Sequence, residues 1–483
     1  MALEIDNVGS AVTCKSAAGI PVDHLRRGPM SSSRRTPSPL LPSLLCSILL
    51  SNAQPSTCAS VHQEGEAAVT LTTVPDFVTR HAPLVWLHSD DPFRPSDLLQ
   101  HVRHTTPMVN GTPVDGLPEL DLDSLALLDD RGFGRFPVAL TTDPDDVTEL
   151  PAWILGETPD ESGALHNTTA CVVIVVESEG DASDVAAFYF YFYSYNRGVN
   201  TTRVLEPIRS MVEKDTDPAM YFGDHVGDWE HNMVRFRDGN PTGIYFSQHS
   251  DGAAYKWNDP ALSKEDERPL VYSAWGSHAN YISPGTHVHD VVIQDYCNAG
   301  QRWDPVSSAY FYRFDALTSK LARIFPPGAP QASNFTSAIY FPGLWGDTQY
   351  PDSDPRQMTV PRFGLKRYVS GPTGPMSKQL VRKALFPDHR APKSWLQWGV
   401  GIFMALYPCC LRGWRVWVSG TLLIVVLVSI TISIIVAARR YRSKKMGYEK
   451  VSAGADIPLN DLRYRDDAAM NGRHSEDDDD KLS

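Results

Sequence analysis

One long uncharged run constrains the membrane topology of this chain. Residues 416–438 carry no charged side chain and are rich in Leu, Ile and Val. About 20 such residues cross a bilayer as a single helix. A basic cluster follows at once, made of Arg439, Arg440, Arg442, Lys444 and Lys445. Because positive residues stay on the cytosolic side, the run predicts one membrane span at 416–438, a luminal or extracellular body before it, and a cytosolic tail at 439–483.

A second basic stretch complicates this orientation. Residues 363–394 hold seven Lys and Arg and one Asp, and they lie on the side predicted to be luminal. The apolar residues 395–411 that follow are short for a span. We interpret residues 351–415 as a basic linker with a segment that abuts the membrane. If residues 395–411 also crossed the bilayer, the tail would be luminal instead.

The N-terminal part has the pattern of a secretory leader. After Met30 come Arg34 and Arg35, an apolar run over residues 40–50, and the small residues Ser51 and Ala53. This order of basic, apolar and small residues predicts a signal peptide that is cut after about Ala53. Residues 1–53 are then a leader, with Met30 as the expected initiator, and residues 54–74 a polar linker. The alternative is a buried apolar segment.

Two further patterns fit an oxidising, luminal environment. Asn-x-Thr acceptor sites for N-glycosylation occur at Asn110, Asn167, Asn200 and Asn334, all between the predicted leader and span. Cys171 and Cys297 lie within the same body. They form either one disulfide, as is common in secreted proteins, or two buried free thiols.

Residues 75–350 read as the folded body, and its pattern is mainly β. The chain has 33 Gly and 37 Pro, which favours many turns over long helices. Residues 170–177 are rich in Val and apolar up to Glu177, which predicts a strand buried on both faces. Residues 185–196 alternate Phe and Tyr, which suits a strand with its Tyr hydroxyls pointing outward. We expect a β-sandwich-like luminal domain. The net charge of −13 argues against a nucleic-acid partner.

The densest cluster of polar residues lies at 223–236, where a turn runs into a predicted strand. Alternation along the strand puts Asp228 and Glu230 side by side on one face, with Trp229 and His231 on the other. Two adjacent carboxylates repel unless a cation, a shared proton or a basic side chain separates them. With hard oxygen ligands and an imidazole close by, one reading is a divalent cation, Ca²⁺ or Mg²⁺, bound by Asp224, His225, Asp228 and Glu230. The other is a strand end whose carboxylates accept backbone N–H bonds or pair with Arg.

Other predicted strands also end in polar clusters. His249 and His278 each follow an apolar strand, and His287 and His289 share one face of another. If these strand ends converge, they form one site. His231, His249 and His278 are then the candidates for a general acid or base in a metal-dependent hydrolase. The chain lacks the Gly-x-Ser-x-Gly, P-loop and His-Glu-x-x-His motifs, so the sequence does not decide whether it is an enzyme.

Three ordered strings carry a resemblance to a known family. They are HVGDWEH at 225–231, IYFSQH at 244–249 and VYSAWGSHANY at 271–281, preceded by APLVWLH at 82–88. These resemble the fungal vacuolar protein sorting-associated protein 62 family and its plant relatives. The resemblance covers most of the body and implies a role in delivering proteins to the vacuole, with a vacuolar cargo or a sorting adaptor as partner. It supplies no catalytic residues.

A fainter resemblance concerns the site itself. The string at 228–231 is similar to the Gly-His-Arg-His-Asp-Trp-Glu heptapeptide of the necrosis-inducing toxin-like β-sandwich proteins. That resemblance implies a divalent cation and membrane damage. His225, Asp228 and Glu230 match, whereas Val226 and Gly227 replace the Arg-His of the heptapeptide.

Three functions are therefore open at this point: a ligand-binding membrane glycoprotein of the secretory and vacuolar route, a membrane-tethered metal-dependent hydrolase, and a toxin-like membrane-binding β-sandwich.

Overall fold

The computed structural model describes residues 73–132, 136–178, 181–216, 220–249, 251–289, 292–329, 335–360, 364–389 and 395–445. The predicted leader, the acceptor site at Asn334 and the predicted tail beyond residue 445 lie outside these ranges. Secondary structure in the folded body is mainly β, as predicted, and its helices are short.

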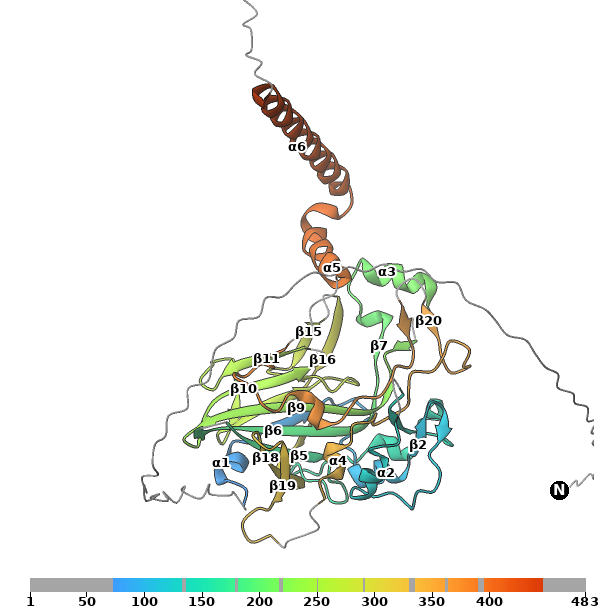
Figure 1. Cartoon of the computed structure of the whole chain (residues 1–483), viewed down its shortest axis with the longest axis vertical. Coiled ribbons are helices and arrows are strands. Elements are labelled where there is room, and N and C mark those ends of the chain that lie inside the picture. The colour runs from blue at the N-terminus through green and yellow to red at the C-terminus, as the bar shows by residue number, and fades with distance from the viewer. Residues whose placement is uncertain are drawn as a thin grey trace, which may run out of the picture. The chain divides into compact units, whose positions relative to one another are not determined.

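A seven-stranded sheet forms the centre of the body (Figure 1). Its strands, in spatial order, are β11 (Asp251–Lys256), β10 (Asn240–Gln248), β9 (His225–Arg237), β6 (Asp181–Asn196), β5 (Cys171–Ser178), β18 (Ala309–Asp315) and β19 (Lys320–Ile324). All neighbours are antiparallel except β5 and β18. Val172 to Val175 of β5 are fully buried, which confirms the prediction of a strand covered on both faces.

One face of this sheet packs on a second, smaller sheet. That sheet contains β12 (Lys264–Glu265), β13 (Arg268–Ser273), β1 (Leu84–Leu87) and β17 (Gln301–Trp303), with β14 (Asn280–Tyr281) paired to β13. Val85, Val271 and Trp303 from the small sheet share one apolar cluster with Tyr189 and Tyr191 of β6. The two sheets thus form a sandwich.

The direction of the tyrosine hydroxyls in β6 differs from the prediction. The hydroxyls do not point outward, because both faces of β6 are covered and Tyr189 and Tyr191 are fully buried between the sheets. Each hydroxyl has an internal acceptor instead: Tyr189 donates to Val78 O at 2.6 Å and Tyr191 to Asn232 Oδ1 at 2.9 Å. Buried hydroxyls need such partners.

Short helices and a small sheet cover the other face. Phe188, Phe190 and Phe192 of β6 pack there in one cluster with residues of α2 (Leu98–Arg103), η1 (Ser124–Leu128) and α4 (Ser337–Tyr340). A small sheet of β3 (Thr112–Pro113), β2 (Thr106–Val109) and β4 (Val138–Thr141) lies in the same region. Asp97 caps α2 by accepting a bond from Gln100 N at 2.9 Å.

The remaining elements of the body are short. They are α1 (Asp76–Arg80), η2 (Val147–Glu149), η3 (Ala152–Leu155), β7 (Val199–Asn200), η4 (Thr201–Arg203), α3 (Ile208–Val212), η5 (Glu213–Asp215), β8 (Tyr221–Phe222), β15 (Gly285–His289), β16 (Ile293–Cys297), η6 (Pro305–Ser307), β20 (Thr359–Val360), β21 (Leu365–Lys366) and η7 (Pro375–Lys378).

The folded body continues beyond residue 350, where the sequence placed its end. Residues 364–389 lie against the large sheet rather than forming a free linker. Gly223 and Asp224 donate backbone bonds to Arg367 O, at 3.1 and 2.9 Å, and the side chain of Arg382 is buried beside β9 and β10. We refer to residues 364–389 as the C-terminal segment.

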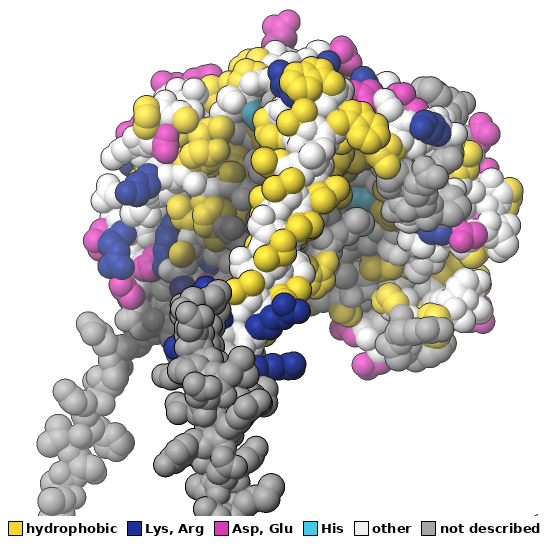
Figure 2. Space-filling view, turned by 90° about the horizontal axis from the view of Figure 1, so that it is seen from above, with side chains coloured by type: hydrophobic (Ala, Val, Ile, Leu, Met, Phe, Trp, Pro, Cys, Tyr) yellow, Lys and Arg dark blue, Asp and Glu magenta, His cyan; other side chains and the backbone are white. Residues whose placement is uncertain are grey.

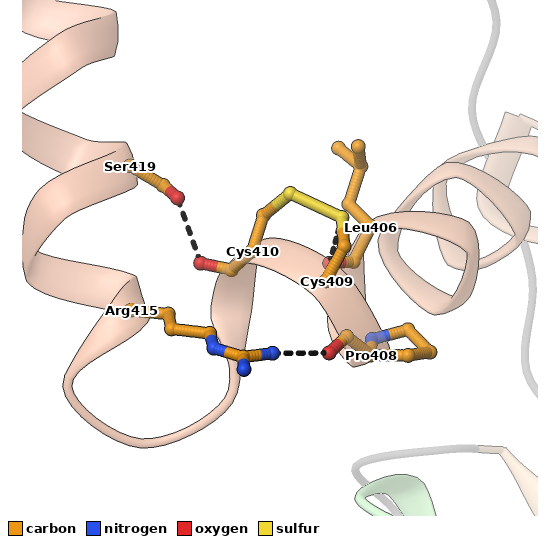
Figure 3. Close-up of a disulfide and its surroundings, with 6 residues drawn as sticks. All are labelled: Leu406, Pro408, Cys409, Cys410, Arg415 and Ser419. Atoms are coloured by element: carbon orange, nitrogen blue, oxygen red, sulfur yellow. Dashed lines mark hydrogen bonds between the residues drawn. A yellow bond between two sulfur atoms is a disulfide. The ribbon is translucent and has the colours of Figure 1, made fainter.

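Three helical elements end the described chain: α5 (Trp395–Leu406), the π-helical turn η8 (Tyr407–Leu411) and α6 (Arg415–Lys445). By length and composition α6 is the one helix among the described residues able to cross a membrane. Figure 2 shows apolar side chains along α6 and basic side chains at its end. Adjacent Cys409 and Cys410 form a disulfide in η8, and Ser419 Oγ of α6 donates to Cys410 O at 2.8 Å (Figure 3).

Candidate functional site

Strand β9 positions most of the residues that the sequence singled out. It lies between β6 and β10, so its alternating side chains meet opposite faces of the sheet. Trp229 and Met233 enter one apolar cluster, and Val234 and Phe236 enter the other, as the alternation predicted. Gly227 has φ +69°, and a Cβ there would lie 2.1 Å from Trp345 O. Only glycine fits at this point.

Asp228 pairs with a histidine from the small-sheet side. His278 Nδ1 lies 2.9 Å from Asp228 Oδ2, and His278 Nε2 lies 3.6 Å from Asp91 Oδ2. The imidazole stacks on Tyr193, with ring centroids 3.7 Å apart, and its side chain is 1% exposed. The His278 imidazole therefore lies between the carboxylates of Asp228 and Asp91.

Glu230 avoids repulsion in a different way. It is buried and accepts a hydrogen bond from the Ser247 hydroxyl. Burial, followed by the charge of Asp228, raises the pKa of Glu230 well above its usual range. Burial therefore favours the protonated form of Glu230. Of the arrangements that the sequence left open for these carboxylates, the structure shows a histidine beside Asp228 and an environment that favours a proton on Glu230.

Asp224 and His225 face other partners. Asp224 accepts from Tyr195 Oη at 2.7 Å and from Gly198 N at 2.9 Å, and it lines a different pocket, of about 380 Å³. Nδ1 of His225 lies 2.7 Å from Gly227 O. Among the described residues, no three of Asp224, His225, Asp228 and Glu230 bring ligand atoms close enough to share an ion. Each of these four side chains contacts a different neighbour. In this arrangement they do not form the Ca²⁺ or Mg²⁺ site that the sequence predicted.

A different set does come together. His249, His289 and Asp295 form the one His, Cys, Asp or Glu group in the described chain whose ligand atoms could hold a metal, all within 4.8 Å of one another. We call these three residues the His–Asp cluster. His249 was predicted as an acid–base candidate and His289 as one of two histidines on a shared face. Asp295 was not singled out.

His231 lies in a pocket closed by the C-terminal segment. The pocket has a volume of about 270 Å³ and is lined by Glu230, His231, Tyr245, Ser247, His249, Asp251, Ser377, Lys378, Gln379, Arg382, Pro387 and His389. Arg382 Nη2 lies 3.1 Å from His231 Nε2. Burial, then the charges of Arg382 and Lys378, lowers the pKa of His231 well below its usual value. His231 is therefore neutral and accepts this bond. We call this cavity the β9–β10 pocket.

Lys378 and Arg382 line the candidate site, and the sequence did not single them out. They belong to the basic stretch at 363–394, which bears on membrane orientation in the sequence analysis. Burial lowers the pKa of Arg382 to about 10, so it remains charged at neutral pH. The available signal was the high basic content of this stretch.

Two of the predicted histidines have an uncommon backbone conformation. His249 and His278 have φ of 54° and 53°, in the left-handed region that non-glycine residues rarely adopt. Such residues concentrate at functional sites. The strand ends do converge here: Gln248 donates to Asn280 O at 2.9 Å and Ser277 to Asp295 at 3.2 Å. This links the end of β10 to the region of His278 and the His–Asp cluster.

The predicted modification sites are placed as follows. Asn110 and Asn167 are exposed, and Asn200 is half-buried with its side chain accepting a bond from Thr202 N at 3.1 Å. Cys171 and Cys297 are buried free thiols that belong to two different apolar clusters. The structure thus has two separate thiols where the sequence allowed either a disulfide or free cysteines.

Two of the solved structures that match this chain share little sequence with it and have low TM-scores. Necrosis and Ethylene inducing Protein 2, from the causal agent of cocoa's Witches Broom disease, is 13% identical with a TM-score of 0.20, covering 44% of this chain and 72% of its own. NLPPya in complex with glucosamine is 12% identical with a TM-score of 0.21, covering 50% and 79%. Similarity at this level carries no conclusion about ligands.

Curated relatives are much more similar. "Putative vacuolar protein sorting-associated protein TDA6" of Saccharomyces cerevisiae is 30% identical over 376 residues, which is 71% of this chain and 72% of the relative. Vacuolar protein sorting-associated protein 62 of the same yeast is 32% identical over 362 residues, covering 70% and 73%. The family profile described as vacuolar protein sorting-associated protein 62 matches residues 148–312, which include β5, β6, β9, β10 and the His–Asp cluster. This chain belongs to the vacuolar protein sorting-associated protein 62 family.

Proposed function

We propose that this chain is a single-pass membrane glycoprotein of the secretory and vacuolar route, whose luminal body binds a cargo or ligand in the β9–β10 pocket and so acts in the delivery of proteins to the vacuole. The pocket is the observation that carries the proposal. It is lined by charged and polar side chains from β9, β10 and the C-terminal segment, which is the kind of concave site that binds ligands.

The charges that line the pocket favour an anionic group on the ligand. Arg382 and Lys378 bring positive charge to the lining, against the exposed carboxylate of Asp251 and the buried Glu230, whose protonated form is favoured because burial raises its pKa. His231 is neutral and buried, and its Nδ1 has no hydrogen-bond partner among the described residues. A carboxylate, a phosphate or an acidic peptide segment would complement this lining.

A charge reversal in the pocket tests the proposal. Lys378→Glu should cause missorting of vacuolar cargo, because it places a negative charge where the ligand's anion binds. Lys383→Glu is the matched control, since Lys383 lies five residues away in the same segment but is exposed. The readout is the ratio of secreted to vacuolar cargo in cells that depend on each variant, with equal amounts of each protein confirmed by blotting. Normal sorting by Lys378→Glu would contradict the role of the pocket.

The orientation rests on α6. Its basic residues, Arg442, Lys444 and Lys445, lie in the last turn, and positive residues stay cytosolic. With a luminal body, Asn110→Gln and Asn167→Gln should each remove one glycosidase-sensitive mobility step, and an epitope after residue 445 should be cut by protease added outside intact vesicles. A protected epitope together with unchanged mobility would reverse the orientation.

A Ca²⁺ or Mg²⁺ ion at Asp228 and Glu230 is tested separately. Such an ion would have to displace the His278 imidazole from Asp228 and the Ser247 hydroxyl from Glu230, and bind a carboxyl group whose neutral form is favoured by burial. Binding to the folded state raises stability by mass action. We therefore expect neither ion to raise the melting temperature of the full chain. A rise in the wild type that is lost in Asp228→Ala/Glu230→Ala would restore the predicted site.

A further inference from the structure

The His–Asp cluster lies where the end of β10 meets the β15–β16 hairpin. His249 follows directly after β10, His289 is the last residue of β15, and Asp295 is in the middle of β16. β15 and β16 form an antiparallel hairpin in which His289 faces Ile293 and His287 faces Asp295. The fold thus brings together residues from two separate hairpins, which no short sequence motif would show.

The three side chains converge on one carboxylate oxygen. His249 Nε2 lies 2.8 Å from Asp295 Oδ2, and His289 Nε2 lies 3.5 Å from the same atom. The two imidazole rings stack with centroids 3.8 Å apart at 20°. Asp295 itself is fully buried.

This arrangement places two imidazole nitrogens and one carboxylate oxygen within reach of a single ion. An imidazole nitrogen that faces a carboxylate oxygen has either a proton or a metal between them. One divalent ion would accept both nitrogen lone pairs and the carboxylate. Bonds of about 2.0–2.2 Å from Zn²⁺ to N and O ligands place neighbouring ligand atoms roughly 3–3.5 Å apart, close to the separations found here.

Two hydroxyl groups also donate hydrogen bonds to the Asp295 carboxylate. Tyr281 Oη donates to Asp295 Oδ2 at 2.9 Å, and Ser277 Oγ donates to Asp295 Oδ1 at 3.2 Å. Such outer hydrogen bonds orient metal ligands.

The cluster is accessible from the β9–β10 pocket. His249 lines that pocket, and its side chain is 27% exposed, while that of His289 is 13% exposed. An ion can therefore enter without unfolding of the body. Three protein ligands leave at least one position of a four-coordinate ion for water or a ligand.

The ligand types select the kind of ion. Two imidazoles and one carboxylate suit Zn²⁺ and similar first-row ions, whereas Ca²⁺ and Mg²⁺ prefer oxygen ligands alone. We propose that His249, His289 and Asp295 bind one Zn²⁺ ion at the wall of the β9–β10 pocket. This site differs in residues and in ion from the one that the sequence predicted at Asp228 and Glu230.

Metal binding to the detergent-solubilised full chain tests the proposal. The chain is stripped with chelator, and Zn²⁺, Mg²⁺ or Ca²⁺ is added while bound metal and melting temperature are measured. We expect one Zn²⁺ per wild-type chain and a higher melting temperature with Zn²⁺ alone. His289→Ala and His249→Ala should each weaken Zn²⁺ binding more than tenfold. Both side chains are partly exposed, so these variants should fold.

His166→Ala is the matched control. His166 also pairs with a carboxylate, Asp160, at 2.9 Å, but lies outside the cluster, so its removal should leave Zn²⁺ binding unchanged. No Zn²⁺ bound to the wild type, or equal binding by wild type and His289→Ala, would overturn the proposal. Because the readout is metal bound to purified protein, it is independent of cargo sorting, and failure of the proposed function would not affect it.

Discussion

Burial of a single imidazole makes the stability of this body sensitive to acid. His101 of α2 is 1% exposed, with Nε2 2.9 Å from Trp345 O and Nδ1 3.0 Å from Ser194 Oγ. Burial lowers the pKa of His101 to about 3. In the unfolded chain the same group takes up a proton near pH 6.5. Between these values only the unfolded state is protonated, so stability falls as the pH drops below 6.5.

The expected loss at pH 5 is about 2 kcal/mol from His101 alone. Chemical unfolding of the solubilised chain at pH 7 and pH 5 measures it, with His101→Gln as the variant that cannot titrate. The wild type should lose about 2 kcal/mol more than the variant over this interval. Equal losses would show that His101 is protonated in the folded state.

The surroundings of the two carboxylates of β9 predict losses of different size on substitution. His278→Ala leaves the buried Asp228 carboxylate without the imidazole 2.9 Å away, and leaving a buried charge unpaired costs about 3–5 kcal/mol. Burial favours the protonated form of Glu230, so Glu230→Gln, which keeps that shape without a charge, should cost less than about 1 kcal/mol. Unfolding free energies of the two variants at pH 7 check this. A large loss in Glu230→Gln would mean that Glu230 is ionised.

At the scale of elements, the C-terminal segment should behave as part of the body. The Arg382 guanidinium lies 4.9 Å from the ring centroids of both Phe188 and Tyr245, and Arg382 donates to buried His231. Arg382→Ala removes these contacts and leaves His231 Nε2 without its donor, at a cost of roughly 1–3 kcal/mol.

Lys383→Ala, one residue away and exposed, should change stability by less than about 0.5 kcal/mol. Thermal unfolding of both variants makes the comparison. If Arg382→Ala were as stable as Lys383→Ala, the segment would be a linker, as the sequence first indicated.

The strands show which local patterns were sufficient. The apolar residues of β5 and the alternating residues of β9 lie on the predicted faces of the sheet. Successive side chains of a strand point to opposite faces, so the sequence alone predicts which residues share a face. The hydroxyls of β6 were misassigned for a related reason. Alternating Phe and Tyr shows that two faces differ, but not that a second sheet covers the tyrosine face.

At the scale of the whole molecule, α6 is expected to anchor the chain. Leu427→Asp puts a charge at the middle of the apolar run, which costs about 2.5–3.5 kcal/mol for insertion in a bilayer. Leu317→Asp is the control, because Leu317 lies in the turn between β18 and β19 and is 72% exposed. Carbonate extraction of membranes should release part of the first variant and none of the second. Full retention of both would show that another segment holds the chain in the membrane.

The sequence by itself determined the mainly β class, the apolar helix and the family, because these depend on local composition, on side-chain period and on strings of adjacent residues. Only the tertiary structure decided which polar groups meet. Asp228 lies beside His278, Glu230 accepts a hydrogen bond from Ser247, and Asp295 lies beside His249 and His289. The chain also placed Lys378 and Arg382 beside β9 from about 150 residues away. A charged side chain is stabilised by the groups within a few ångströms of it in the fold. The distance between two residues along the chain does not reveal which groups these are.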